Sequence, residues 1–221
     1  MRGRRSLLAA TSIVGTVTAA TRLRMVPLSA LAATPRDIAE GKVWLLATSA
    51  LVADRPWLPS MLGFVGVGLV ALAVCGTAMT WATAALGHMV STLLVYALVA
   101  AVGLVRPHAF QSVLTLSDYG LSAIIAAWLG AIASLEWKRR PAVGPRAAVA
   151  ALCVLAALVG WLLRPDLTVL DLEHLVAFAL GAALVRRAPA ATARLAAQLR
   201  SKPAPIARSV RVSSWSGRAG L

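Results

Sequence analysis

Long apolar runs, separated by short charged segments, are the feature that most constrains this chain. They cover approximately residues 6–21, 58–74, 79–105, 119–135, 147–163 and 170–185. A helix needs about 20 mostly apolar residues to cross the hydrocarbon core of a bilayer. With 59% hydrophobic and 14% charged residues, the chain is also too apolar for an ordinary soluble domain. We therefore predict an all-α fold, a polytopic membrane bundle of six transmembrane helices.

The first apolar run allows two interpretations. It follows three arginines within the first five residues and ends in small residues near Ala20. A basic start, an apolar middle and small residues at the end also describe a cleaved signal peptide. We expect a retained first helix, with cleavage as the alternative.

A shorter apolar stretch, residues 43–53, lies between the first two runs. Pro35 and the pair Arg36-Asp37 interrupt the chain before it. Eleven residues are too few to span a bilayer as a helix, so the stretch predicts an interfacial or re-entrant segment.

The basic residues predict the orientation of the chain. Three precede the first run, four lie between the fourth and fifth, eight follow the sixth, and seven occupy the opposite loops. Because positive charge favours the cytoplasmic side, both termini are expected in the cytoplasm of a multi-pass plasma-membrane protein. The net charge of +14 thus reflects membrane orientation and does not indicate nucleic-acid binding.

The chain is expected to have two parts. Residues 1–187 form the transmembrane domain, and residues 188–221 form a basic tail rich in Ala, Arg, Ser and Pro. Such a composition is typical of disorder, and the basic residues could contact anionic lipid. Tryptophans near the ends of the runs are interpreted mostly as interfacial anchors; they are Trp44, Trp57, Trp81, Trp128, Trp137 and Trp161.

Ser122 and His174 are the candidate catalytic residues. Each lies about one turn into an apolar run, the fourth and the sixth. In the predicted topology these two helices are parallel, so they bring the hydroxyl and the imidazole to the same depth. A polar residue inside a span is a candidate for function, and a serine beside a histidine can form a nucleophile and its base.

Small residues predict that the two helices pack closely. Gly130 lies eight residues after Ser122, while Ala177 and Gly181 follow His174 on the same helix face. Small residues at steps of about four let helix backbones approach in lipid. We therefore expect Gly130, Ala177 and Gly181 at a contact that unites the serine and the histidine.

These motifs resemble those of rhomboid intramembrane serine proteases. The block Gly120-Leu121-Ser122-Ala123 with Gly130 resembles the G-x-S-G…G fourth helix of that family. His174-Leu175-Val176-Ala177 with Gly181 resembles its H-x-x-G-x-x-x-G sixth helix, and residues 45–51 resemble the stretch that opens its first loop. The resemblance covers roughly residues 43–186, and the D-x-G-x-S at residues 118–122 is similar to actinobacterial rhomboid-like membrane proteins.

The resemblance implies a reaction and roles for individual residues. Ser122 would attack a peptide bond of a transmembrane substrate, and His174 would be the general base. Gly120 would belong to the region that supports the oxyanion. Asp171, three residues before His174, either orients the imidazole or is a solvated carboxylate favoured by the positive end of its helix.

Other positions depart from the family pattern. The H-x-x-x-N motif of the second helix falls near Trp57 and Met61, and only the neighbouring Ser60 could donate a hydrogen bond to an oxyanion. The aromatic residue expected four positions after the serine is Ala126. These departures keep an alternative open, in which the chain is an inactive rhomboid-like protein that binds transmembrane segments of other membrane proteins.

The remaining residues with reactive side chains indicate no cofactor and no metal site. Cys75 and Cys153 lie within apolar runs without the spacing of metal ligands. His88 falls near the middle of the third run, so we expect it to pack against a neighbouring helix with its nitrogens bonded to backbone or Ser91. A solute transporter is disfavoured, since the sequence shows no inverted repeat.

Overall fold

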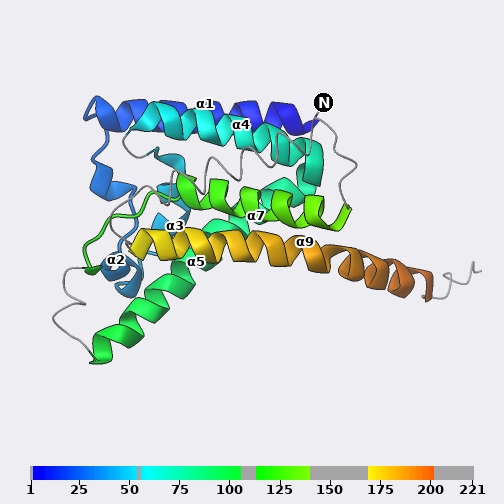
Figure 1. The fold of residues 1–221 in the computed structure, drawn as a ribbon. Helices are drawn as coiled ribbons and strands as arrows, with labels where there is room; N and C mark the ends of the chain where they lie inside the picture. The colour runs from blue at the N-terminus through cyan, green and yellow to red at the C-terminus, as the bar shows by residue number, and fades with distance from the viewer. Residues whose placement is uncertain (1, 54–55, 106–112, 140–168, 202–221) are drawn as a thin grey trace, which may run out of the picture. The chain divides into compact units, whose positions relative to one another are not determined.

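The computed structural model describes residues 2–53, 56–105, 113–139 and 169–201, and this part of the chain is all-helical (Figure 1). The prediction of an all-α fold is confirmed. The long helices are α1 (Arg2–Arg22), α4 (Trp57–Cys75), α5 (Thr77–Val105), α7 (Leu121–Arg139) and α9 (Val169–Ser201). The fifth predicted span, residues 147–163, lies outside the described residues.

Two of these helices are long and apolar enough to cross a membrane. They are α4, over all of its 19 residues, and α5, from Thr77 to Leu104. A shorter apolar helical stretch occupies Leu121–Trp137 in α7. Length and composition thus agree with the predicted second and third spans, and the complete six-span bundle stays a prediction.

Short helices connect α1 to α4. They are η1 (Leu28–Ala30), α2 (Pro35–Ala39), α3 (Leu45–Thr48) and η2 (Ser49–Leu51). The predicted short apolar segment, residues 43–53, therefore forms α3 and η2, and it buries Leu45, Leu46 and Ser49 within the protein.

Trp128 of α7 occupies the centre of the hydrophobic core. Its ring contacts Phe64 of α4 in a tilted arrangement at 5.0 Å between centroids and meets Trp81 of α5 edge-on at 6.2 Å. The indole Nε1 donates to the Thr80 carbonyl oxygen at 2.8 Å, which satisfies the buried N–H. Trp128 is therefore a core residue and not an interfacial anchor, because it lies in the middle of α7 on its inner face.

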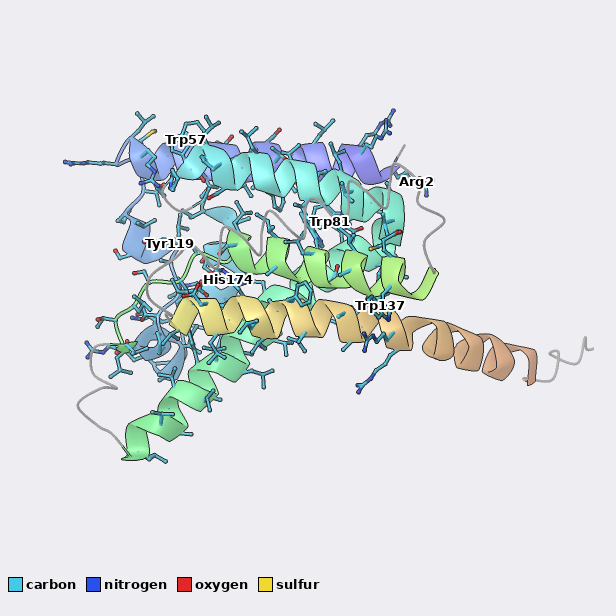
Figure 2. The ribbon with its side chains drawn as sticks, in the orientation of Figure 1. Arg2, Trp57, Trp81, Tyr119, Trp137 and His174 are labelled. Atoms are coloured by element: carbon cyan, nitrogen blue, oxygen red, sulfur yellow. The ribbon has the colours of Figure 1, made fainter. Side chains whose placement is uncertain are left out.

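The tryptophans at helix ends differ from Trp128. Trp57 begins α4 and Trp137 lies in the last turn of α7, and both side chains are exposed (Figure 2). Trp81 also lies near the start of its helix, but its Nε1 donates to Ser6 Oγ of α1 at 2.9 Å.

Helix α1 belongs to the hydrophobic core. Leu7 and Val14 are buried, and both lie in one cluster with Phe64 and Trp128. A methyl group at Gly3 would collide with the side chain of Thr77, so α1 also approaches the start of α5 closely. The first apolar run is thus a packed helix in this structure.

The chain divides into two compact units, Met1–Arg187 and Ala188–Leu221. Helix α9 continues to Ser201, so residues 188–201 are helical where the composition predicted disorder. This stretch is rich in Ala, Leu, Arg and Gln, which are strong helix formers, and that preference explains the difference. Residues 202–221 lie outside the described residues.

Candidate functional site

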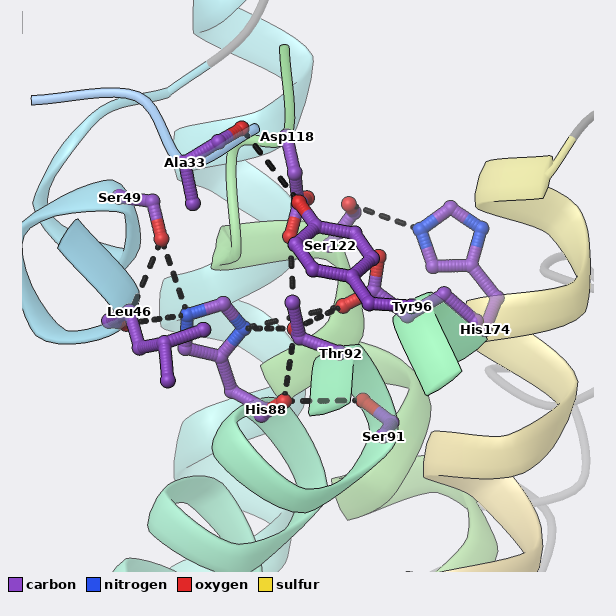
Figure 3. A network of polar contacts seen from close by, with 11 residues as sticks. Ala33, Leu46, Ser49, His88, Ser91, Thr92, Tyr96, Asp118, Ser122 and His174 are labelled. Carbon is purple, nitrogen blue, oxygen red and sulfur yellow. Dashed lines mark hydrogen bonds and ion pairs between the residues drawn. The ribbon is translucent and has the colours of Figure 1, made fainter. Parts of the chain in front are cut away.

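Ser122 and His174 form a hydrogen-bonded pair. Ser122 lies in the first turn of α7, and His174 lies in the second turn of α9. His174 Nε2 is 2.8 Å from Ser122 Oγ (Figure 3). The serine is exposed and the histidine is half-buried, so the hydroxyl is accessible from outside the protein. The structure therefore brings together the two residues that the sequence singled out.

The two helices run in the same direction and approach each other through small residues (Figure 1). A methyl group at Gly130 would collide with the Phe178 carbonyl oxygen, and one at Gly181 with the Ala127 carbonyl oxygen. Ala177 packs with Ala123 and Ala127 in a separate buried cluster. All three residues predicted for helix packing, Gly130, Ala177 and Gly181, lie at the contact between α7 and α9.

The two candidate oxyanion donors are engaged elsewhere. The Gly120 N–H donates to the Ser49 carbonyl oxygen at 3.2 Å. Ser60 Oγ donates to the Pro56 carbonyl oxygen at 3.2 Å, one turn earlier in the chain. In the described part of the chain, no hydrogen bond links Ser60 to Ser122 or His174. These two groups therefore do not form a preorganised oxyanion hole in this structure.

Asp171 lies in the first turn of α9, as the sequence indicates. Its side chain is only 1% exposed, so it is not the solvated carboxylate of the prediction.

A buried polar cluster lies next to the serine–histidine pair. We define it by His88 and Thr92 of α5, Asp118 in the segment before α7, and Glu173 of α9, all of which are buried (Figure 3). Thr92 Oγ1 lies 2.6 Å from Glu173 Oε1 and 3.4 Å from Asp118 Oδ2. Asp118 and Glu173 were not predicted from the sequence as members of one site, although ionisable residues beside or within apolar runs are a known signal of function.

The His88 imidazole is held on one side by the segment before α4. Its Nε2 lies 2.7 Å from the Leu46 carbonyl oxygen and 3.1 Å from Ser49 Oγ. Ser91 Oγ donates to the His88 carbonyl oxygen and not to the ring. The predicted bond from the imidazole to backbone is therefore present, while Ser91 contacts only the backbone of His88.

His88 also lies much closer to the serine region than its position in α5 suggested. Gly120, two residues before Ser122, lies against the His88 ring, and a methyl group at that glycine would overlap the ring atoms. Helix α5 extends well past this point and ends in exposed residues such as Leu104. Because α5 is longer than a simple span, the middle of its sequence lies level with the beginning of α7.

Asp118 is fixed by both its backbone and its surroundings. Its N–H donates to the Ala33 carbonyl oxygen at 2.8 Å, and Ala33 donates back to the Asp118 carbonyl oxygen at 3.4 Å. Burial raises the pKa of the Asp118 carboxyl, an effect that hydrogen bonds with Thr92 and Glu173 partly offset.

Nearby residues in the D-x-G-x-S motif and at the start of α9 make different contacts. In the first motif, Asp118 joins the buried cluster, Gly120 contacts His88, and Ser122 contacts His174. In α9, Glu173 joins the cluster while the next residue, His174, bonds the serine. The buried cluster and the exposed pair are thus built on the same two segments of chain.

Comparison of the chain with protein-family models, with curated proteins and with solved structures gives no match.

Proposed function

We propose that this chain is a rhomboid-like integral membrane protein and that Ser122 and His174 form the dyad of an intramembrane serine protease. The observation that carries the proposal is the 2.8 Å contact between His174 Nε2 and Ser122 Oγ. In that geometry an unprotonated Nε2 accepts the hydroxyl proton while Oγ attacks a peptide carbonyl carbon. The resulting imidazolium then donates the proton to the leaving amine, and water hydrolyses the acyl-enzyme.

The exposure of the apolar helices supports a membrane location. Only 33% of the apolar window of α4 and 28% of that of α5 are buried inside the protein. A core helix of a soluble protein would be mostly buried, and apolar side chains left in water cost about 25 cal/mol per Å². Lipid contact removes this cost, and the positions of the basic residues favour cytoplasmic termini in the plasma membrane.

The proposed substrates are transmembrane segments of other membrane proteins. Ser122 lies near the end of α7 that the predicted topology places at the outer surface, and its side chain is exposed. The carbonyl groups of a helical segment are hydrogen-bonded internally. A substrate segment must therefore unwind at that level to present a peptide bond to Oγ.

A second function is favoured by the engaged oxyanion donors. The Gly120 N–H is bonded to Ser49 and the Ser60 hydroxyl to Pro56, and loss of one oxyanion donor typically costs about 2.7–4 kcal/mol in the barrier. The alternative is a catalytically inactive rhomboid-like protein that binds transmembrane helices of other proteins through the same face.

Covalent labelling of the full chain in membranes separates these two functions. A fluorophosphonate or isocoumarin probe is expected to label the wild type and to miss Ser122→Ala and His174→Ala. Ser29→Ala, at an exposed serine of η1, is the matched control and should label like the wild type. A folded wild-type protein that does not react with either probe would favour the inactive binding protein.

A further inference from the structure

The buried polar cluster places two carboxylates among few hydrogen-bond donors. Besides Thr92, the Ser91 hydroxyl bonds Glu173 and the Tyr119 N–H bonds Asp118. Thr92 has a single hydroxyl proton, and it faces the His88 carbonyl oxygen at 2.9 Å, Glu173 Oε1 at 2.6 Å and Asp118 Oδ2 at 3.4 Å. One proton cannot satisfy these acceptors together. In the described part of the chain, no Lys or Arg forms an ion pair with either carboxylate. Two buried carboxylates this close to one another require added positive charge, either as a proton shared between Asp118 and Glu173 or as a bound cation.

The His88 ring is oriented as a metal ligand would be. The Leu46 carbonyl oxygen can only accept, so in the neutral ring Nε2 carries the proton that fills the 2.7 Å contact. Nδ1 then carries a lone pair, and it faces Thr92 Oγ1 at 3.5 Å and Glu173 Oε1 at 3.9 Å. Metal-binding histidines commonly donate their other ring N–H to a backbone carbonyl in this way, which fixes the tautomer.

The distances allow one ion to contact three ligands. One ligand atom each from His88, Asp118 and Glu173 lie within 4.8 Å of one another. Ligands at about 2.0–2.2 Å from a common tetrahedral ion lie about 3.3–3.6 Å apart, so small side-chain rotations complete the geometry. A neutral imidazole with two carboxylates carries two negative charges, which a divalent cation balances.

We propose that His88 Nδ1 and the carboxylates of Asp118 and Glu173 form a binding site for a divalent transition-metal ion, with Zn²⁺ the favoured ion. Imidazole selects transition metals over Mg²⁺ and Ca²⁺, and Zn²⁺ binds such sets more tightly than Mn²⁺ or Fe²⁺. The sequence indicated no metal because the three ligands come from α5, the segment before α7, and α9.

The ion would hold together the segments that carry the dyad. Asp118 precedes Ser122 by four residues, and Glu173 is the neighbour of His174. The site is structural in this proposal, so metal binding does not depend on proteolytic activity, and the two properties can be measured separately.

Metal content of the purified full chain is the test. The protein, loaded with ZnCl₂ in detergent and freed of loose metal by gel filtration, should retain about one zinc ion per chain by mass spectrometry. Glu173→Gln and Asp118→Asn keep the side-chain shape and should lower retention at least tenfold. Asp171→Asn changes another buried carboxylate of α9, and His174→Ala removes the dyad imidazole; both should retain zinc, although His174→Ala loses probe labelling.

X-ray absorption of the zinc-loaded wild type keeps the proposal testable if a variant fails to fold. A first shell of nitrogen and oxygen with a single imidazole is expected. Sulfur, or several imidazoles, in that shell would overturn the assignment. A wild-type chain that retains no zinc would also overturn the assignment, and it is the result expected if protons alone supply the positive charge. Variants that bind zinc as the wild type does would overturn it as well.

Discussion

Gly120 shows how one residue serves both the buried cluster and the exposed pair. Its missing side chain leaves the space that the His88 ring fills, and its N–H is bonded to Ser49. The serine two positions later lies in the first turn of α7, in the register that reaches His174. The glycine of the D-x-G-x-S motif is therefore required for close packing, a role that no local pattern reveals because His88 lies on a different helix.

We expect Gly120→Ala to destabilise the protein and to abolish probe labelling. The new methyl group overlaps the His88 ring, and overpacking of this kind costs about 1–3 kcal/mol. Gly66→Ala is the matched control, since no atom lies within 4 Å of its added methyl group. That change should be neutral or stabilising by up to about 1 kcal/mol in thermal unfolding. Equal melting temperatures for the two variants would contradict the packing role.

The hydrogen bonds of Asp37 at the start of α2 predict that the stability of the protein depends on pH. Hydrogen bonds from Lys42 at 2.7 Å and Thr34 at 2.6 Å lower the pKa of the Asp37 carboxyl. Since the folded pKa is lower than the unfolded value of 3.8, this stabilisation is present above pH 4 and disappears as the pH falls through the folded pKa. Asp37→Asn should lower the melting temperature by roughly 1–2 °C at pH 7, and the difference should vanish in acid.

Glu40→Gln is the control for Asp37. It removes the other carboxylate near Lys42, at 2.9 Å, but leaves the contacts of Asp37 intact. A difference between wild type and Asp37→Asn that persists unchanged at pH 3 would rule out the ionised carboxylate as its cause.

At the scale of elements, the α7–α9 contact positions the Ser122–His174 pair. Gly130 and Gly181 each place a Cα hydrogen against a carbonyl oxygen of the other helix. We expect Gly130→Ala and Gly181→Ala to push the helices apart by about 1 Å, enough to cost roughly 100-fold in labelling rate. Gly63→Ala, where the added methyl group lies 3.5 Å from the Ile125 side chain, is the interface control and should label normally. Labelling rates that stay within about twofold of wild type in all three variants would contradict this dependence.

Helix α1 carries a second prediction at this scale. Leu7 is 2% exposed and packs in the core, whereas its neighbour Leu8 is 66% exposed. Leu7→Ala should lower the free energy of unfolding by about 2–5 kcal/mol, and Leu8→Ala should change it by less than about 0.5 kcal/mol. Equal stability of the two variants would instead favour removal of this segment as a signal peptide.

The long helices could be predicted from the sequence, and the buried cluster could not. An apolar run of about 20 residues has few alternatives to a helix, so residues 58–74 predicted α4 to within one residue at each end. Ser122 and His174 could be paired because small residues and matching depth both pointed to one contact. His88, Asp118 and Glu173 meet only through the packing of separate segments. The depth of His88 could not be predicted from its position in the sequence, because α5 is longer than a simple span.

At the scale of the whole molecule, the proposed topology makes a prediction that includes segments beyond the described residues. With both termini in the cytoplasm, six spans place residue 146 and residue 187 inside and residue 166 outside. Green fluorescent protein fused after residues 146 and 187 should fluoresce, because it folds in the cytoplasm. Alkaline phosphatase fused after residue 166 should be active, because it needs the oxidising exterior. Active phosphatase after only one of residues 146 and 187 would place these two positions on opposite sides and require a different number of spans between them. In that case α7 and α9 would no longer enter the membrane from the same side, although the Ser122–His174 contact depends on their parallel course.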